Sequence, residues 1–119
     1  MNVRIRKFQP SDTLGFYDAL KESIDHIGKW LPWCTPEYSM QNAEDWIASS
    51  LETWDSDQEY RFVIEDGDSG EFLGSIALNQ LIKAHQIGNL GYWIRKSALN
   101  QGIAKQACKL AVDYIFKHF

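Results

Sequence analysis

The C-terminal part of the sequence, Gln101 to Phe119, carries a helical pattern long enough to constrain the fold of the whole chain. Its apolar residues recur at intervals of three and four and cover an arc of about 140°, as in a helix that packs on a sheet. These residues are Ile103, Ala104, Ala107, Leu110, Ala111, Tyr114 and Ile115. Val112, Phe116 and Phe119 fall outside the arc, so we expect an exposed apolar patch that a second surface covers.

The first half of the sequence predicts one strand and two helices. Val3 to Gln9 alternates apolar and polar residues and stops at Pro10, which is typical of a half-buried strand. A helix then begins at Ser11 or Asp12 and ends at Gly28, with an expected buried face of Leu14, Tyr17, Leu20, Ile24 and Ile27. After an ordered loop rich in proline and tryptophan, a second helix runs from Ser39 to about Thr53.

The second half predicts three further strands before the terminal helix. Tyr60 to Glu65 and Phe72 to Asn79 flank a glycine-containing turn and form a hairpin, and Ile87 to Ile94 supplies the next strand. A chain of 119 residues has room for one domain. We therefore expect a single α+β (mixed α/β) domain in the order β-α-α-β-β-β-α, with a central, mostly antiparallel sheet flanked by helices.

Charge and cysteine content exclude several classes of function. The formal net charge of −4 removes the simplest electrostatic case for binding nucleic acid, and the basic residues at positions 4, 6 and 7 are expected on the solvent face of the first strand. Cys34 and Cys108 match no metal-ligand spacing, so we expect no metal site and a reducing compartment. No apolar run reaches the length of a membrane span and no signal peptide is visible, which favours a cytoplasmic protein without a membrane partner.

The segment from Gly91 to Lys105 reads as a strand that passes through a short loop into a helix. The first turn of a helix has unpaired backbone N–H groups and the positive end of the helix dipole, and Gly102 has no side chain to keep an anion away from them. Lys96 and Lys105 add positive charge nearby. The segment therefore indicates an anion site, although Gly102 could instead serve only a turn or close helix packing.

Five places in the sequence resemble the GCN5-related N-acetyltransferases (GNAT), and within them the RimJ/RimL branch of ribosomal-protein N-terminal acetyltransferases. They are Ile5-Arg6-Lys7-Phe8 before Pro10-Ser11-Asp12, Leu31-Pro32-Trp33, Phe72-Leu73-Gly74-Ser75-Ile76, Leu90-Gly91-Tyr92-Trp93-Ile94, and Asn100-Gln101-Gly102-Ile103-Ala104. The resemblance implies a GNAT-like fold and transfer of acetyl from acetyl-CoA to a primary amine, in the first place the N-terminal α-amine of a protein. Amino-acid, polyamine and antibiotic amines are further candidate acceptors.

The resemblance also implies where acetyl-CoA, the cosubstrate, would bind. The family's phosphate-binding motif aligns with Leu99 to Ala104, and the strand from Tyr92 to Arg95 would pair with the pantetheine arm. Leu99 replaces a polar residue of the motif, and Asn100 stands where glycine is common but tolerates a positive φ. The expected cofactor-binding residues are Trp93, Ile94, Arg95, Asn100, Gln101, Gly102, Ile103, Ala104 and Lys105.

The catalytic groups are less clear from the sequence. Related enzymes often carry a glutamate on the strand before Gly-Tyr-Trp, but this chain has Asn89 there, and an amide is no base at neutral pH. Asn89 is therefore a weak candidate, through its backbone or a water. A backbone N–H of Ile94 or Arg95 is the expected oxyanion donor. His85 is the nearest histidine in the sequence and is expected to be an incidental loop residue.

Aromatic residues between the two predicted helices suggest an acceptor groove walled by Trp30, Leu31, Trp33 and Tyr38, with plain core packing as the alternative. Complete members of the resembled family continue past the terminal helix, so we expect a domain without the final strands and helix. A homodimer formed through the open strand edge, Val112, Phe116 and Phe119 would cover the exposed surface. Two alternatives to an enzyme remain. One is a non-catalytic module that binds acyl-CoA or serves oligomerisation, and the other is an inert remnant of the fold.

Overall fold

The computed structural model of the chain describes residues 2–29, 31–82 and 87–118; the side chains of residues 80–82 and 87–89 lie outside the description. Its strands are β1 (Val3–Lys7), β2 (Tyr60–Asp66), β3 (Phe72–Ile82) and β4 (Ile87–Ile94), and its helices are α1 (Thr13–Ile27), α2 (Met40–Asp55) and α3 (Ile103–His118). Two short 3₁₀ helices, η1 (Pro10–Asp12) and η3 (Lys96–Ala98), precede α1 and α3. The predicted order of elements is confirmed.

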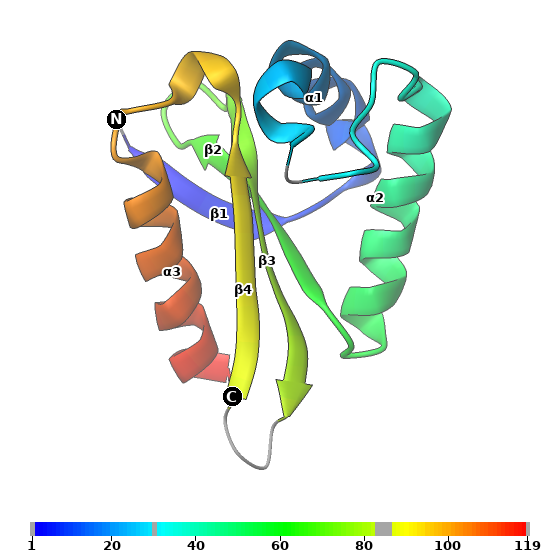
Figure 1. Cartoon of the computed structure of the whole chain (residues 1–119). Helices are drawn as coiled ribbons and strands as arrows, with labels where there is room; N and C mark the ends of the chain where they lie inside the picture. Colours follow the sequence, from blue (N-terminus) through cyan, green and yellow to red (C-terminus); the bar gives the residue numbers. More distant parts are fainter. Residues whose placement is uncertain (1, 30, 83–86, 119) are drawn as a thin grey trace.

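The four strands form one sheet in the order β1-β2-β3-β4, and each neighbouring pair is antiparallel. Figure 1 shows α3 on one side of this sheet and α1 and α2 on the other. Side chains alternate between the two sides, as the pleat requires. Phe62 and Ile64 of β2 belong to the core under α3, whereas Val63 belongs to the core under α1 and α2.

The two predicted helix boundaries near residues 28 and 39 are confirmed. Gly28 N–H donates to Ile24 O at the end of α1, and Ser39 caps α2 by accepting a hydrogen bond from Asn42 N at 3.1 Å. The expected buried face of α1 is wrong at Leu14, which is 61% exposed. Leu20 and Ile27 are buried as expected, Tyr17 and Ile24 are half-buried, and Phe16, Ala19 and Ser23 are also buried.

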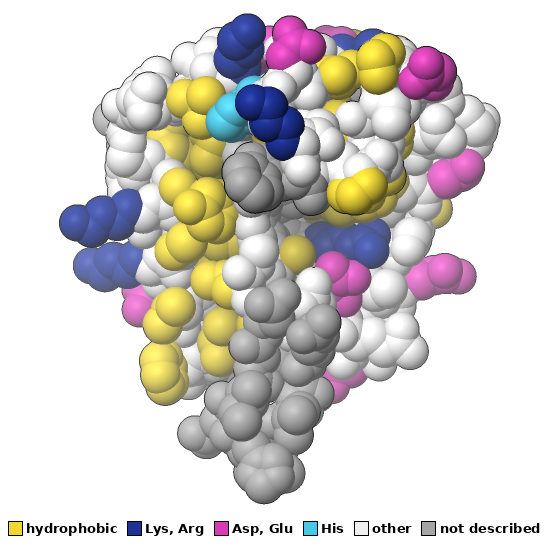
Figure 2. All heavy atoms as spheres, viewed as in Figure 1, with side chains coloured by type: hydrophobic (Ala, Val, Ile, Leu, Met, Phe, Trp, Pro, Cys, Tyr) yellow, Lys and Arg dark blue, Asp and Glu magenta, His cyan; other side chains and the backbone are white. Residues whose placement is uncertain are grey.

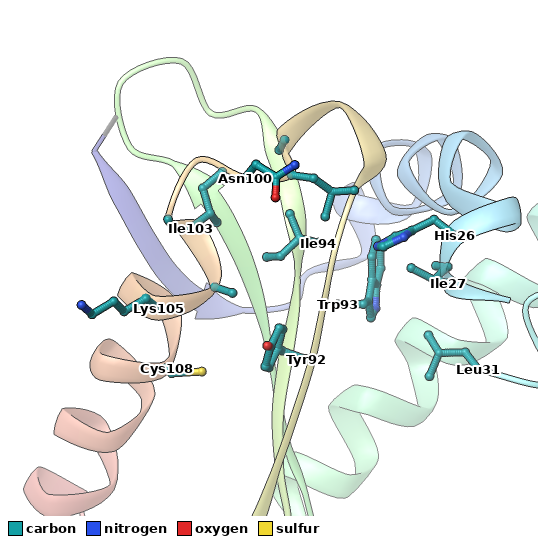
Figure 3. Close-up of a pocket in the computed structure, with 14 residues that line it drawn as sticks. His26, Ile27, Leu31, Tyr92, Trp93, Ile94, Asn100, Ile103, Lys105 and Cys108 are labelled. Atoms are coloured by element: carbon teal, nitrogen blue, oxygen red, sulfur yellow. The ribbon is translucent and has the colours of Figure 1, made fainter. Parts of the chain in front are cut away.

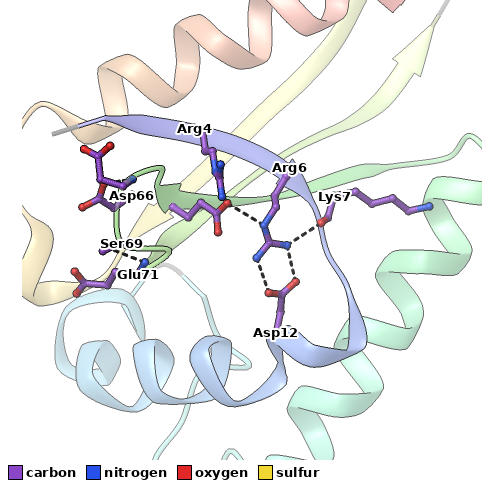
Figure 4. Close-up of polar contacts among 9 residues, drawn as sticks. Arg4, Arg6, Lys7, Asp12, Asp66, Ser69 and Glu71 are labelled. Atoms are coloured by element: carbon purple, nitrogen blue, oxygen red, sulfur yellow. Dashed lines mark hydrogen bonds and ion pairs between the residues drawn. The ribbon is translucent and has the colours of Figure 1, made fainter.

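The basic side chains of β1 are exposed or partly exposed, as expected: 56% for Arg4, 32% for Arg6 and 42% for Lys7. Arg4 and Arg6 also bind a buried carboxylate, which the strand pattern did not predict (Figure 4). The Glu65 side chain is 3% exposed and lies 2.5 Å from Arg4 Nε and 3.0 Å from Arg6 Nε. Arg6 also forms two hydrogen bonds with Asp12, at 2.7 and 2.9 Å. Because a buried carboxylate is costly without cations, Arg4 and Arg6 stabilise Glu65 in the folded protein.

The apolar residues outside the buried arc of α3 are exposed, as predicted. Phe116 is 81% exposed and Val112 is 40% exposed, and Tyr92 on the neighbouring edge strand β4 is 55% exposed. On the face seen in Figure 2, apolar side chains gather over α3. Phe119, the third residue of the predicted patch, lies outside the described residues.

Candidate functional site

The larger of two neighbouring cavities has a volume of about 720 Å³ and opens between α1, the edge of β4 and the start of α3 (Figure 3). Most of the residues that the sequence assigned to a cofactor line it: Trp93, Ile94, Asn100, Gly102, Ile103, Ala104 and Lys105. Two of the predicted residues, Arg95 and Gln101, do not line it. Seven of the nine residues predicted to bind the cofactor therefore line one cavity, and they come from one continuous segment.

The loop before α3 has the backbone geometry of an anion site. Asn100 has φ 63° and Gly102 has φ 71°, so the chain turns twice through the left-handed region before the helix begins. The first hydrogen bond of α3 runs from Gln106 N to Gly102 O at 3.3 Å. The N–H groups of Ile103, Ala104 and Lys105 precede the helical ladder and leave the helix end available to an anion.

A Cβ atom built on Gly102 would meet nothing within 4 Å, and Gly102 lines the larger cavity. The side chain of Leu99, which replaces a polar residue of the family motif, lines the same cavity. An anion here would therefore be held by backbone N–H groups and the helix dipole, with the cationic side chain of Lys105 beside it.

The backbone of β4 offers a second set of polar groups along the cavity. Arg95 N donates to Leu73 O at 2.8 Å, which identifies Leu73 and Arg95 as a hydrogen-bonded pair of the antiparallel ladder. Because such pairs alternate along a ladder, the N–H and C=O groups of Ile94 and Tyr92 point away from β3. Among the described strands none pairs with this edge, so these groups face the larger cavity.

The two backbone candidates for an oxyanion donor therefore differ. The N–H of Arg95 is used by Leu73 O, which corrects the expectation that it serves as a donor at the site. The N–H of Ile94 points to the open edge, and Ile94 lines the cavity. The backbone of Asn89 pairs with Asn79 in the β3–β4 register, but its side chain lies outside the described residues, and so does the whole of His85.

The side chain of Arg95 holds the turn after β4 against α1. Its guanidinium binds the Glu22 carboxylate through two nitrogens, and its Nη1 donates to Phe72 O at 3.0 Å. Glu22 also accepts a hydrogen bond from Ser97 N at 2.9 Å, and buried Ser23 accepts one from Lys96 N at 2.9 Å. These bonds fix η3, and η3 leads directly into the anion-site loop.

Glu22 should contribute stability that disappears in acid. Burial by itself would raise the pKa of Glu22, but hydrogen bonds from Ser97 and Arg95 outweigh burial and lower it below the usual 4.5. A group whose pKa is depressed in the folded state stabilises the protein above its unfolded pKa, and this contribution is lost as pH falls through the folded pKa. We expect Glu22→Gln to reduce the free energy of unfolding at pH 7 by about 2 kcal/mol.

The measurement is urea unfolding between pH 7 and pH 3. The stability of Glu22→Gln should decline less steeply below pH 4.5 than that of the unchanged protein. Asp18→Asn, at an exposed position on the same helix, is the matched control and should follow the unchanged protein. Equal acid dependence in Glu22→Gln and Asp18→Asn would contradict the role of the Glu22 contacts.

A smaller cavity of about 360 Å³ lies against the sheet on the side of α1 and α2. It shares Leu31, Tyr92 and Trp93 with the larger cavity, so β4 and the loop after α1 separate two adjoining spaces. Of the residues expected to wall an acceptor groove, Leu31 and Trp33 line it, whereas Trp30 lies outside the described residues.

Tyr38, the fourth residue expected in the groove, lines neither cavity. Its side chain is 8% exposed and packs against Trp33 with ring centroids 5.4 Å apart. Burial raises the pKa of Tyr38 to about 12. For Tyr38 the alternative interpretation, core packing, is therefore correct.

Several lining residues could not be found from sequence patterns. His26 and Cys108 line the larger cavity, although both have the spacing of ordinary helical residues. Glu59 and Arg61 line the smaller cavity, and they lie beside Trp33 only because β2 runs next to β3 and under α2. These positions are set by tertiary packing, and the sequence gives no local signal for them.

Two structural findings bear on other classes of site. Within the described part of the chain, no three His, Cys, Asp or Glu side chains lie close enough together to hold a metal ion. None of the described helices combines the length and the apolar character that crossing a membrane requires.

Comparison with known proteins gives a consistent result. A family model described as an acetyltransferase (GNAT) domain matches residues 2–119. A Bacillus subtilis protein named "Putative ribosomal N-acetyltransferase YdaF" is 25% identical over 98% of this chain and 63% of its own length. Among solved structures, the Salmonella typhimurium acetyltransferase that modifies the N-terminal serine of ribosomal protein L7/L12 has a TM-score of 0.86 at 14% identity and matches 98% of this chain and 65% of that one.

A further solved structure, Mycobacterium smegmatis RimJ in complex with CoA-disulfide, has a TM-score of 0.82 at 20% identity and matches 96% of this chain and 56% of that one. At these identities the two solved structures show a shared fold. The chain spans less than two thirds of the length of each of these three proteins.

Proposed function

This chain belongs to the acetyltransferase (GNAT) family, and from that premise we propose that it transfers an acetyl group from acetyl-CoA to a primary amine. The preferred acceptor is the N-terminal α-amine of a protein, in keeping with relatives named for ribosomal-protein acetylation. The observation that carries the proposal is the 720 Å³ cavity between the open edge of β4 and the N-terminal end of α3.

The volume of the larger cavity and the backbone groups along it support acetyl-CoA as its ligand. Its volume is within the usual range for small-molecule sites. The loop from Asn100 to Gly102 and the first N–H groups of α3 would hold the pyrophosphate, and the outward backbone groups of Tyr92 and Ile94 would bind the amides of the pantetheine arm. Relatives such as RimJ bind CoA in a shared fold.

In the transfer itself, the acceptor ammonium first loses a proton to solvent, and the free amine nitrogen bonds to the acetyl carbon. The carbon–sulfur bond then breaks, and the leaving CoA thiolate takes up the second proton that the nitrogen loses. The N–H of Ile94 is the described donor best placed at the open edge to stabilise the carbonyl oxygen. The smaller cavity, which shares Trp93 with the larger one, would admit the amine from the other side of β4.

A non-catalytic acyl-CoA-binding module is the second candidate. One specific observation favours it: the described residues that line the larger cavity include no carboxylate, and Leu99 stands in place of a polar residue. Such a module would bind acetyl-CoA without releasing free CoA thiol. An enzyme would release thiol in proportion to the amine supplied.

A second copy of the chain is the proposed partner at the exposed surface of α3. Phe116 and Val112 expose apolar area there, and the edge of β4 carries backbone groups that no described strand pairs. Large exposed apolar patches commonly mark protein interfaces.

Both cysteines are free, and Cys34 is buried, which fits the proposed location in a reducing cytoplasm.

The test is thermal unfolding of the protein with increasing acetyl-CoA, with sedimentation of the same samples and an assay for released thiol. Ligand at 100 times its Kd stabilises the folded state by about 2.7 kcal/mol, which should raise Tm by about 10 °C. A saturable rise with thiol release on addition of a peptide amine supports the enzyme, and a rise without release supports the binding module. No rise at millimolar acetyl-CoA would contradict both.

A further inference from the structure

We propose that Glu59 is the carboxylate that binds the ammonium group of the acceptor in the smaller cavity. The proposal rests on the proposed function, because it takes the acceptor to be a protonated primary amine. Among the described residues that line either cavity, Glu59 is the one acidic side chain. It lies immediately before β2, and its side chain is 20% exposed, so it is held at the cavity wall and not free in solvent.

Arg61 fixes the position of Glu59. Its Nη2 lies 3.1 Å from Glu59 Oε2, and its Nη1 lies 3.1 Å from Ser50 Oγ. Its guanidinium also stacks over the ring of Trp46, 4.5 Å from the ring centroid. The guanidinium is therefore bound by a carboxylate, a hydroxyl group and an aromatic ring at the same time. Arg61 acts as a positioning residue for Glu59, and an anionic acceptor would gain little binding energy from it.

The other oxygen of Glu59 keeps capacity for a ligand. Glu59 Oε1 accepts from Asn79 Nδ2 at 3.4 Å, which is a long hydrogen bond. Each carboxylate oxygen can accept two hydrogen bonds, and an ammonium group is a donor of three. A protonated amine can therefore bind Oε1 without breaking the contact between Glu59 and Arg61.

The remaining walls suit a cation with a short apolar chain. Trp33 is 38% exposed at the rim and stacks on Trp46 at 6.4 Å between ring centroids. Aromatic faces attract ammonium groups, and Leu31 and Ala77 supply apolar wall beyond them. Because Trp93 lines both cavities, an amine bound at Glu59 would lie in the space that adjoins the larger cavity, where acetyl-CoA is proposed to bind.

The experiment is a calorimetric titration with the dipeptide amide Ala-Ala-NH₂, which has a free α-amine, and with its N-formyl derivative, which has no positive charge. The unchanged protein should bind the free amine and bind the N-formyl derivative at least about 10-fold more weakly. Glu59→Gln keeps the size of the side chain and should weaken binding of the free amine about 10-fold. Glu59→Asp keeps the charge and should retain part of the affinity.

Glu44→Gln is the matched control, since Glu44 is exposed on α2, lines neither cavity and loses the same charge. It should bind the amine as the unchanged protein does. All four proteins should show the same rise in Tm with acetyl-CoA, which excludes misfolding as the cause. Equal amine binding by Glu59→Gln and Glu44→Gln, or equal binding of the free and formylated peptides, would overturn the role of Glu59.

The same data separate this proposal from the proposed function. Acetyl-CoA binding with no amine binding by the unchanged protein would overturn the assignment of Glu59 and leave the larger cavity as the acetyl-CoA site. Glu59-dependent amine binding with no response to acetyl-CoA would support Glu59 as an amine ligand and overturn the proposed function.

Discussion

Gly102→Val is expected to lower the affinity of the protein for acetyl-CoA by about 100-fold or more. Gly102 has φ 71°, a conformation that costs most side chains about 1–2 kcal/mol and a β-branched one more. A valine side chain here would take up space at the wall of the larger cavity, at the residue directly before the first N–H groups of α3. Phosphate oxygens need that space to reach these groups, and each charge-assisted hydrogen bond lost costs about 1.5–3 kcal/mol.

Gly70→Val is the matched control for this substitution. Gly70 has φ 78° in the turn between β2 and β3, and a Cβ there also meets nothing within 4 Å. Both variants should therefore lose similar stability in urea, but only Gly102→Val should lose the rise in Tm with acetyl-CoA and the binding heat in calorimetry. If Gly102→Val binds acetyl-CoA as tightly as Gly70→Val does, the assignment of the anion site is wrong.

The larger cavity was predictable because most of its polar groups come from one continuous segment. The spacing of Asn100, Gly102 and the helix that follows indicates an anion site, and the expectation that Asn100 tolerates a positive φ is confirmed at 63°. The smaller cavity was only partly predictable. Trp33 and Leu31 have a visible aromatic and proline context, whereas Glu59 joins them through the pairing of β2 with β3.

One error of the sequence analysis and one contact that it missed have the same physical origin. The burial of α1 was inferred from large apolar side chains, but the small residues Ala19 and Ser23 are also buried and Leu14 is exposed. The arginines of β1 are exposed or partly exposed, as expected, but the pattern of the strand did not reveal that they bind the buried carboxylate of Glu65. In both cases the contacts are made by residues far away in the sequence. The spacing of apolar residues within one helix or strand therefore does not predict them.

Gly74→Ala should destabilise the protein by about 3 kcal/mol or more and should weaken acetyl-CoA binding as well. Gly74 lies on β3 opposite Ile94, and a Cβ on Gly74 would lie 2.1 Å from Trp93 O and 3.1 Å from Ile94 Cα. Both contacts are with backbone, so no side-chain rotation relieves them. The strands must separate at Trp93 and Ile94, where the two cavities adjoin.

The matched control for this second substitution is Gly91→Ala on β4, where an added Cβ meets nothing within 4 Å. Each change adds one methyl group and removes the same freedom from the unfolded chain, so the unfolded-state effects cancel. Gly91→Ala should change the free energy of unfolding by no more than about 0.5 kcal/mol. Urea unfolding measures the difference in stability between the two variants. The rise in Tm with acetyl-CoA, measured on each variant that is still folded, shows whether the acetyl-CoA site is intact. Equal stability of the two variants would mean that β3 and β4 are not held at this separation, and that the open edge of β4 does not present Tyr92 and Ile94 as described.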